Sequence, residues 1–138
     1  MGSESSADRS MLEAILGGDG RMWKQYSSAI PGERVFQIIG IATSAAVFRK
    51  WSEDPSLQTV VDYVAEIDRR FPSELPVARA TLESVIRGIF GETDLIDGMS
   101  SQDIVVAEIL ITRSIGFDIL TSDAQRNSYF DEVLAAVD

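Results

Sequence analysis

The sequence predicts an all-α protein, an irregular bundle of five to six helices in a single domain. Apolar residues recur at steps of three and four positions, the period of an amphipathic helix, and no segment alternates strongly enough to indicate a strand. Residue pairs typical of helix caps precede several of these segments. The length of 138 residues fits one domain of ordinary size with its own apolar core.

The N-terminal segment shows little sign of regular structure. Residues 1–9 lack the apolar stretch of a secretory signal and are expected to form a disordered tail. The helical domain is therefore predicted over residues 10–138. Ser10 has the form of a helix cap, because Glu13 follows three residues later.

Two aromatic residues in the next segment are the best candidates for recognition. Trp23 and Tyr26 stand three positions apart and can share one face of a short helix. Trp and Tyr are enriched among the residues that dominate binding at protein interfaces. We expect these two side chains either to contact a partner or to fold back over the bundle.

The first long helix is expected over about residues 33–51. Its uncharged run, residues 35–48, spans roughly 20 Å as a helix, well short of the bilayer core of about 30 Å. The run therefore predicts a core helix and no membrane interaction. Gly40 and Ser44 stand four positions apart and, with the alanines between and after them, form a thin surface on which another helix can pack closely.

Two amphipathic helices follow. Asp54 as cap and Pro55 as first helical residue predict the start of the first, and Phe71 ends it before a proline. The segment SELP, residues 73–76, opens the second, and Gly91 ends it.

The loop after this helix concentrates carboxylates near glycines. Glu92, Asp94 and Asp97 are weak candidates for a calcium or magnesium site, because hard cations prefer oxygen ligands. Their spacing does not follow the order of an EF-hand loop, and acidic residues before a helix are also expected from capping and the helix dipole. We expect neither a bound metal nor a cofactor.

Residues 104–120 form the second strongly apolar helix, capped by Ser100 or Ser101. Glu108 and Arg113 interrupt it. These two lie about 140° apart around the helix axis and cannot pair with each other. Each needs a partner on another helix, in solvent or on a second subunit. Both are therefore candidate ligand- or partner-binding residues, and the alternative is that they are structural charges.

The last helix is predicted to begin at Ser122, which forms a capping box with Gln125. Residues 35–48 and 104–120 carry more apolar surface than the amphipathic helices can cover. We therefore expect a homodimer that buries this surface, and the alternative is a monomer in which the last helix covers it.

Composition excludes several kinds of chemistry. The chain contains neither histidine nor cysteine, which removes the commonest general base, the usual nucleophile pairs and most zinc sites. With 12 basic and 22 acidic residues, the net charge of −10 repels the phosphates of nucleic acids and anionic membranes. The acidity is compatible with a basic protein partner and with simple solubility. A cytoplasmic location is expected.

Three classes of function remain. The first is a non-enzymatic interaction or regulatory protein, such as an adaptor, an antitoxin or an immunity-type inhibitor. The second is a small-ligand binding domain with an apolar pocket between helices. The third is a carboxylate-dependent, metal-assisted hydrolase, for which Asp62 with Glu66 and Asp94 with Asp97 are the available pairs. The absence of a recognisable catalytic motif favours the first.

Overall fold

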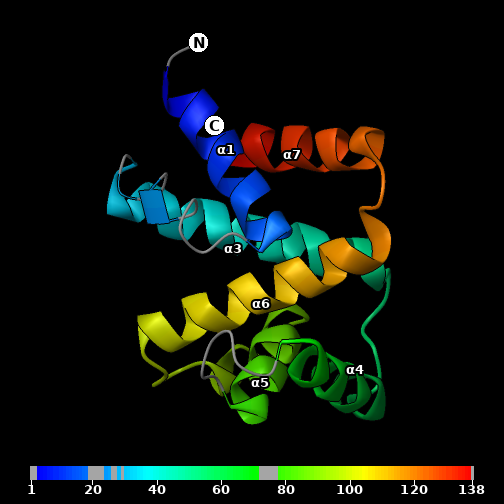
Figure 1. Cartoon of the computed structure of the whole chain (residues 1–138). Helices are drawn as coiled ribbons and strands as arrows, with labels where there is room; N and C mark the ends of the chain where they lie inside the picture. Colours follow the sequence, from blue (N-terminus) through cyan, green and yellow to red (C-terminus); the bar gives the residue numbers. More distant parts are fainter. Residues whose placement is uncertain (1–2, 19–23, 26–27, 29, 72–77, 138) are drawn as a thin grey trace.

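The computed structural model describes residues 3–18, 24, 25, 28, 30–71 and 78–137. Within these residues the chain forms six α-helices, one short 3-10 turn and no strand, which confirms the predicted all-α bundle (Figure 1). None of these helices is both long and apolar enough to span a membrane. The elements are α1 (Ser3–Gly17), α3 (Gly32–Lys50), α4 (Leu57–Arg70), α5 (Arg79–Ile89), η1 (Thr93–Leu95), α6 (Ser101–Ile119) and α7 (Asp123–Val137).

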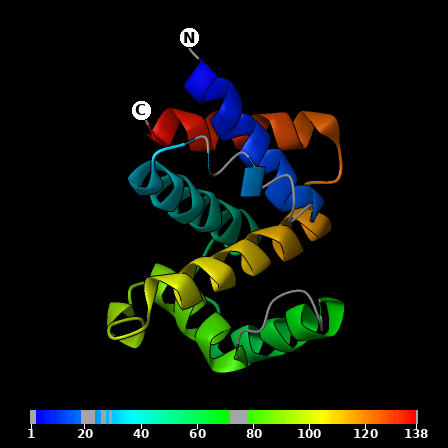
Figure 2. The same ribbon diagram turned by 60° about the vertical axis from the view of Figure 1, so that its left-hand side comes forward.

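Helix α6 lies at the centre of the bundle. Figure 1 and Figure 2 agree that α4 and α5 lie on one side of it, whereas α1, α3 and α7 lie on the other. Helices α3 and α6 run side by side in the same direction, and α7 packs on α3 and α1. As a result α6 contacts four other helices and is the most buried element of the described chain.

The burial of α6 extends over nearly three turns. Every residue from Ala107 to Gly116 is buried except Glu108. Three consecutive buried residues, TRS at positions 112–114, are polar. Because successive residues of an α-helix point about 100° apart, these three side chains leave the helix in three different directions. Each must therefore find its hydrogen-bond partner on a different neighbour.

The partners come from three helices. The hydroxyl of Thr112 lies 3.0 Å from that of Thr43 on α3. The Nε of the next residue, an arginine, donates to the carbonyl oxygen of Ile15 near the end of α1, at 3.0 Å. The hydroxyl of the third, a serine, lies 2.8 Å from that of Tyr63 on α4. One short segment of α6 thus fixes the positions of α1, α3 and α4.

Two of the predicted helix caps are confirmed. The Ser100 hydroxyl accepts from the backbone N–H of Asp103 at 3.1 Å, at the start of α6. At the start of α7, Ser122 and Gln125 form a reciprocal capping box: the serine hydroxyl accepts from the glutamine N–H at 3.1 Å, and the glutamine side chain accepts from the serine N–H at 3.0 Å.

The predicted cap of α4 is wrong by two residues. The cap is Ser56 rather than Asp54, because the Ser56 hydroxyl accepts from the backbone N–H of Thr59 at 3.2 Å and Pro55 lies before the helix. Serine and aspartate cap a helix about equally well, so the sequence alone does not choose between them. The predicted opening at residues 73–76 lies outside the described residues, and α5 is capped by Ala78 without a side-chain bond.

The N-terminal prediction is wrong for most of its length. Residues 3–9 are not a disordered tail, because α1 begins at Ser3 and passes through Ser10 without a break. Contacts with another helix, rather than the local sequence, explain why this segment is ordered. The side chain of Asp8 is fully buried, and its Oδ2 accepts from Nε and Nη2 of Arg34 on α3 at 3.0 and 2.7 Å. An ion pair between residues far apart in sequence therefore holds a segment without an apolar pattern in the bundle.

The close approach between helices occurs at a different glycine from the one predicted. A Cβ added to Gly40 would meet only the Glu108 carboxylate, at 3.8 Å, an ordinary contact. A Cβ added to Gly116 on α6 would lie 2.6 Å from Cδ2 of Leu16 on α1. A methyl group on residue 116 would therefore force the end of the Leu16 side chain to move, whereas Gly40 and Ser44 on α3 are only half-buried and have room.

The two glycines predict different effects of an added methyl group. Gly40→Ala should raise the free energy of unfolding by roughly 0.5–1 kcal/mol, because alanine favours the helix and has room. Gly116→Ala should raise it by less or not at all, because the new methyl group forces the end of the Leu16 side chain to shift. Urea denaturation followed by circular dichroism at low protein concentration measures both. A larger gain in stability at position 116 than at position 40 would contradict this explanation.

Candidate functional site

The residues that the sequence singles out do not gather in one place. Trp23 and Tyr26 lie outside the described residues, so the prediction for them stays a prediction. Arg113 is buried between α6 and α1, and Glu108 lies at the contact between α6 and α3. Three other features of the molecule have the residues or the shape that a site needs: a polar cluster, a pocket and an uncovered helix face.

The acidic loop offers little to a metal ion. Glu92 accepts from Nε and Nη2 of Arg87, both at 2.8 Å, and these hydrogen bonds lower the pKa of the carboxyl below its usual value. Asp94 and Asp97 are exposed on and after η1. Within the described residues, no group of three or more acidic side chains is arranged to hold a metal ion.

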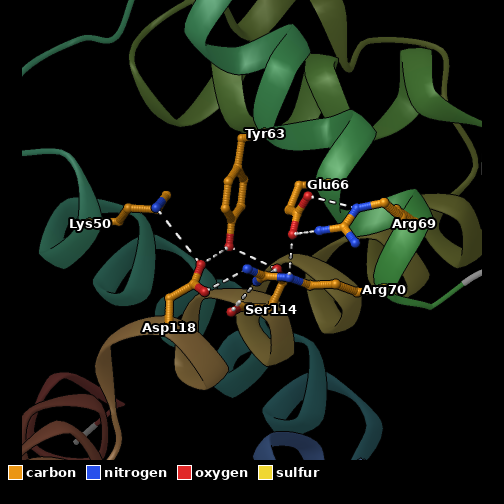
Figure 3. Close-up of polar contacts among 7 residues, drawn as sticks. All are labelled: Lys50, Tyr63, Glu66, Arg69, Arg70, Ser114 and Asp118. Carbon is orange, nitrogen blue, oxygen red and sulfur yellow. Dashed lines mark hydrogen bonds and ion pairs between the residues drawn. The ribbon is translucent and has the colours of Figure 1, made fainter.

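The polar cluster joins α4, α6 and the end of α3 (Figure 3). The hydroxyl of Tyr63 donates to Oδ2 of Asp118 at 2.9 Å. Nη2 of Arg70 lies 2.8 Å from the other carboxylate oxygen, and its Nη1 donates to the Ser114 hydroxyl at 3.0 Å. Lys50 approaches the same carboxylate at 3.8 Å. The Asp118 carboxylate therefore forms ion pairs with Arg70 and Lys50 and accepts a hydrogen bond from the Tyr63 hydroxyl.

The charges of this cluster are mutually compensated. Glu66 accepts from both Arg69 and Arg70. Burial alone would raise the pKa of Asp118, but hydrogen bonds from Arg70 and Tyr63 outweigh it and lower the pKa. Burial raises the pKa of the Tyr63 hydroxyl. Around neutral pH the carboxylate is charged and the phenol is protonated, so neither is suited to act as a general acid or base.

Sequence reasoning missed this cluster. Tyr63 stands within the apolar stripe of α4, where an aromatic residue looks like ordinary core. The only signal was Asp118, a charge near the end of an apolar helix. We interpret the cluster as a structural link between α4 and α6, because its described polar groups are hydrogen-bonded or ion-paired with one another.

A pocket of about 810 Å³ lies where the end of α1, the second half of α6 and the start of α7 meet. We call it the α6–α7 pocket. Its apolar lining comes from Leu16, Phe71, Phe117, Leu120 and Phe130. The charged lining residues are Glu13, Arg113, Asp123 and Arg126. This pocket could not be predicted from the sequence, because its residues come from segments more than 100 positions apart and its aromatic residues resemble core residues.

The described helices leave one side of α3 largely uncovered. Phe36, Gly40, Ser44 and Phe48 recur at four-residue steps on this side, which we call the α3 outer face. The two phenylalanines are 53% and 49% exposed. No residue between positions 35 and 48 carries a charge. The described helices therefore leave uncovered an apolar strip that the sequence predicted to be core.

Glu108 borders this face. Its Oε2 lies 3.8 Å from the position of a Cβ on Gly40. Within the described part of the chain, the carboxylate forms no hydrogen bond or ion pair, and burial raises its pKa to about 7. The sequence correctly singled out this residue but could not show that it would lie beside the uncovered strip.

Comparisons of the chain with models of protein families, with curated protein sequences and with solved structures found no match. Function is therefore inferred from the local chemistry of these features, because an all-helical fold by itself implies no activity.

Loss of the Tyr63 hydroxyl should weaken the packing of α4 on α6, because two hydrogen bonds between these helices are removed. Tyr63→Phe should lower the free energy of unfolding by about 1–3 kcal/mol, because buried groups on α6 lose a hydrogen-bond partner. Urea denaturation measures the change. Combined with Asp118→Asn, the loss should be smaller than the sum of the single losses. A Tyr63→Phe protein as stable as the parent would refute the structural role.

The raised pKa of Glu108 predicts a specific pH dependence. The folded protein holds the Glu108 proton more tightly than the unfolded chain between pH 4.5 and about 7. The free energy of unfolding should therefore fall as the pH rises through this range, by on the order of 2 kcal/mol from this group.

Glu108→Gln should remove that dependence and make the protein more stable than the parent at pH 8. Glu53→Gln, at an exposed position, is the matched control and should leave the pH profile unchanged. Thermal denaturation across this pH range measures both. Parallel profiles for the parent and Glu108→Gln would show that Glu108 titrates normally.

Proposed function

We propose that this chain is a non-enzymatic interaction protein that associates with a second copy of itself through the α3 outer face. One observation carries the proposal: Phe36 and Phe48 are about half exposed on an uncharged helix face, although the chain as a whole has a net charge of −10. Exposed apolar patches of this kind mark interaction surfaces.

The order of residues on this face suits a two-fold axis. Phe36 and Phe48 are equally distant from the level of Ala42 along the helix, and so are Gly40 and Ser44. If two α3 helices cross antiparallel at that level, each Phe36 meets the Phe48 of the second copy, and the small residues meet at the centre. Small residues allow close approach there, and a closed two-fold dimer needs a surface complementary to itself.

Charge also favours this face over the rest of the surface. Two copies of a chain with net charge −10 repel each other wherever acidic residues face one another. The α3 outer face itself has no charged residue, and the carboxyl of Glu108 at its edge has a pKa of about 7 and can be neutral. An apolar centre with charges confined to the rim is the usual anatomy of such interfaces.

The other classes have weaker support. A hydrolase would need a base or a metal, but the sequence has no histidine and no cysteine, and most carboxylates of the described clusters are paired with arginines. A basic protein partner remains a prediction from net charge, and the cytoplasmic location remains a prediction as well.

If the chain self-associates in this way, a charge introduced at the centre of the α3 outer face should weaken the dimer. Sedimentation equilibrium at tens of micromolar should give the mass of two chains for the parent. Ser44→Arg should raise the dissociation constant by on the order of 100-fold or more, because an unpaired charge would be buried. Ser128→Arg, on the exposed side of α7, should leave it unchanged.

Two outcomes would refute the proposal. One is a parent protein with the mass of a single chain at these concentrations. The other is a Ser44→Arg protein that dimerises as well as the parent. Circular dichroism should show that both variants keep the helical content of the parent, because neither position is in the core.

A further inference from the structure

We propose that self-association through the α3 outer face is coupled to the uptake of a proton by Glu108, so that the dimer dissociates more readily as the medium becomes alkaline. The coupling rests on the proposed function, because two copies must meet on that face before the proton can affect their affinity. It makes pH a control on the surface that the exposed phenylalanines mark.

The Glu108 carboxylate lies beside the centre of the face. Its Oε2 is 3.8 Å from the position of a Cβ on Gly40, and its backbone carbonyl accepts a hydrogen bond from the Thr43 hydroxyl at 3.4 Å. Along α3 these two positions lie between the exposed rings of Phe36 and Phe48. A second copy packed on the face would therefore lie against this carboxylate and displace water from it.

No group of the described chain compensates a charge on Glu108. Burial is the one cause that raises the pKa of this carboxyl to about 7, and neither Glu33 of α3 nor Glu83 of α5 contributes to the shift. On the four helices that contact α6, the described arginines and the lysine of α3 have carboxylate partners elsewhere. These pairs are Arg9 with Asp131, Arg34 with Asp8, Arg49 with Glu132, Lys50 and Arg70 with Asp118, Arg69 with Glu66, Arg79 with Asp68, and Arg87 with Glu92.

A two-fold axis would bring the two Glu108 carboxylates close to each other. The axis that relates two antiparallel helices packed face to face runs across both of them, so one edge of the first helix meets the same edge of the second. In a crossing at the level of Ala42, Gly40 of one copy lies opposite Ser44 of the other. The two carboxylates, each beside a Gly40, would then lie on one edge of the crossing, about 6 Å apart along the helix direction.

Ionised carboxylates would oppose this contact in two ways. Each would lose part of its remaining water, and burial disfavours the charged form of a carboxyl. The two charges would also repel each other, with less screening than at an open surface. Protonated carboxyls avoid both costs. They can also donate hydrogen bonds, and the Ser44 hydroxyl of the second copy lies at the same level as an acceptor.

The direction of the pH dependence follows from these pKa values. In the single chain the pKa of Glu108 is about 7, and its burial in the dimer raises that pKa further. Above the single-chain pKa, the dimer binds more protons than two separate chains do, so its dissociation constant increases with pH. Below about pH 6, Glu108 is protonated in both states, and the group no longer changes the dissociation constant.

Sedimentation equilibrium at several pH values tests the coupling. For the parent, the dissociation constant should be at least about tenfold larger at pH 8 than at pH 6, because two carboxyls titrate in each dimer. Glu108→Gln keeps the shape of the side chain but cannot ionise, so it should dimerise more tightly than the parent at pH 8 and lose most of the pH dependence. Glu53→Gln, at an exposed position outside the face, is the matched control and should keep the pH dependence of the parent.

Calorimetry of dilution counts the protons directly. When the parent dimer dissociates at pH 7.5 in buffers of different ionisation enthalpy, it should release about one to two protons per dimer. Glu108→Gln should release close to none. Circular dichroism at each pH confirms that the chains compared are folded.

The outcomes separate a failure of the coupling from a failure of self-association. A parent dimer with the same dissociation constant at pH 6 and pH 8 would overturn the coupling and leave the dimer in place. A Glu108→Gln dimer with the pH dependence of the parent would do the same, because another group would then carry the effect. A parent with the mass of one chain at both pH values would refute self-association and the coupling together.

Discussion

The structure depends on the need to satisfy three consecutive buried polar side chains on the central helix. Thr112, Arg113 and Ser114 lie in the most buried part of α6, where an unpaired polar group costs as much as a lost hydrogen bond or more. Each is satisfied by a different helix, so α1, α3 and α4 are held in both position and rotation about α6. Apolar packing alone would permit α6 to turn or slide against its neighbours at smaller cost.

The described helices also explain why function is sought at the edges of the bundle. Where polar groups are buried together, as around Asp118, they compensate one another and leave little reactivity. Apart from the buried Oδ1 of Asp8, the described features that remain unsatisfied include half-exposed aromatic rings and a carboxyl of raised pKa on the outside of α3, and an open pocket near the end of α1. Unsatisfied surface, rather than a conspicuous sequence motif, therefore locates the proposed interface on α3.

The sequence predicted the helices from local signals, and it failed where the cause is not local. The apolar period located α3 to α7, capping residues marked the starts of α6 and α7, and the Ser122–Gln125 box was correct in detail. The beginning of α1 was missed because the pairing of Asp8 with Arg34 leaves no pattern within the segment. The Gly40 prediction failed for a similar reason: a small residue permits close packing, but only the fold decides which helix, if any, occupies the space.

The candidate sites show the same division. Glu108 and Arg113 could be singled out because a charge in an apolar helix is visible in the sequence. The groups that surround these two side chains in the fold could not be predicted. Arg113 bonds to a backbone carbonyl, and a carbonyl has no sequence signature. The pocket was invisible because its phenylalanines, Phe117 and Phe130, have the spacing of core residues and become a lining only when α1 packs beside them.

The position of α1 has a consequence for how the chain folds. Besides the pair of Asp8 with Arg34, it is held by contacts between residues 98 positions apart, Ile15 and Arg113, and 122 positions apart, Arg9 and Asp131. During synthesis α1 leaves the ribosome before α6 and α7, which form much of its binding surface. Most of the contacts of α1 can therefore form only after α6 and α7 have been made, and its docking on them closes a long loop of chain. Docking of α1 is thus expected to be a late event in folding.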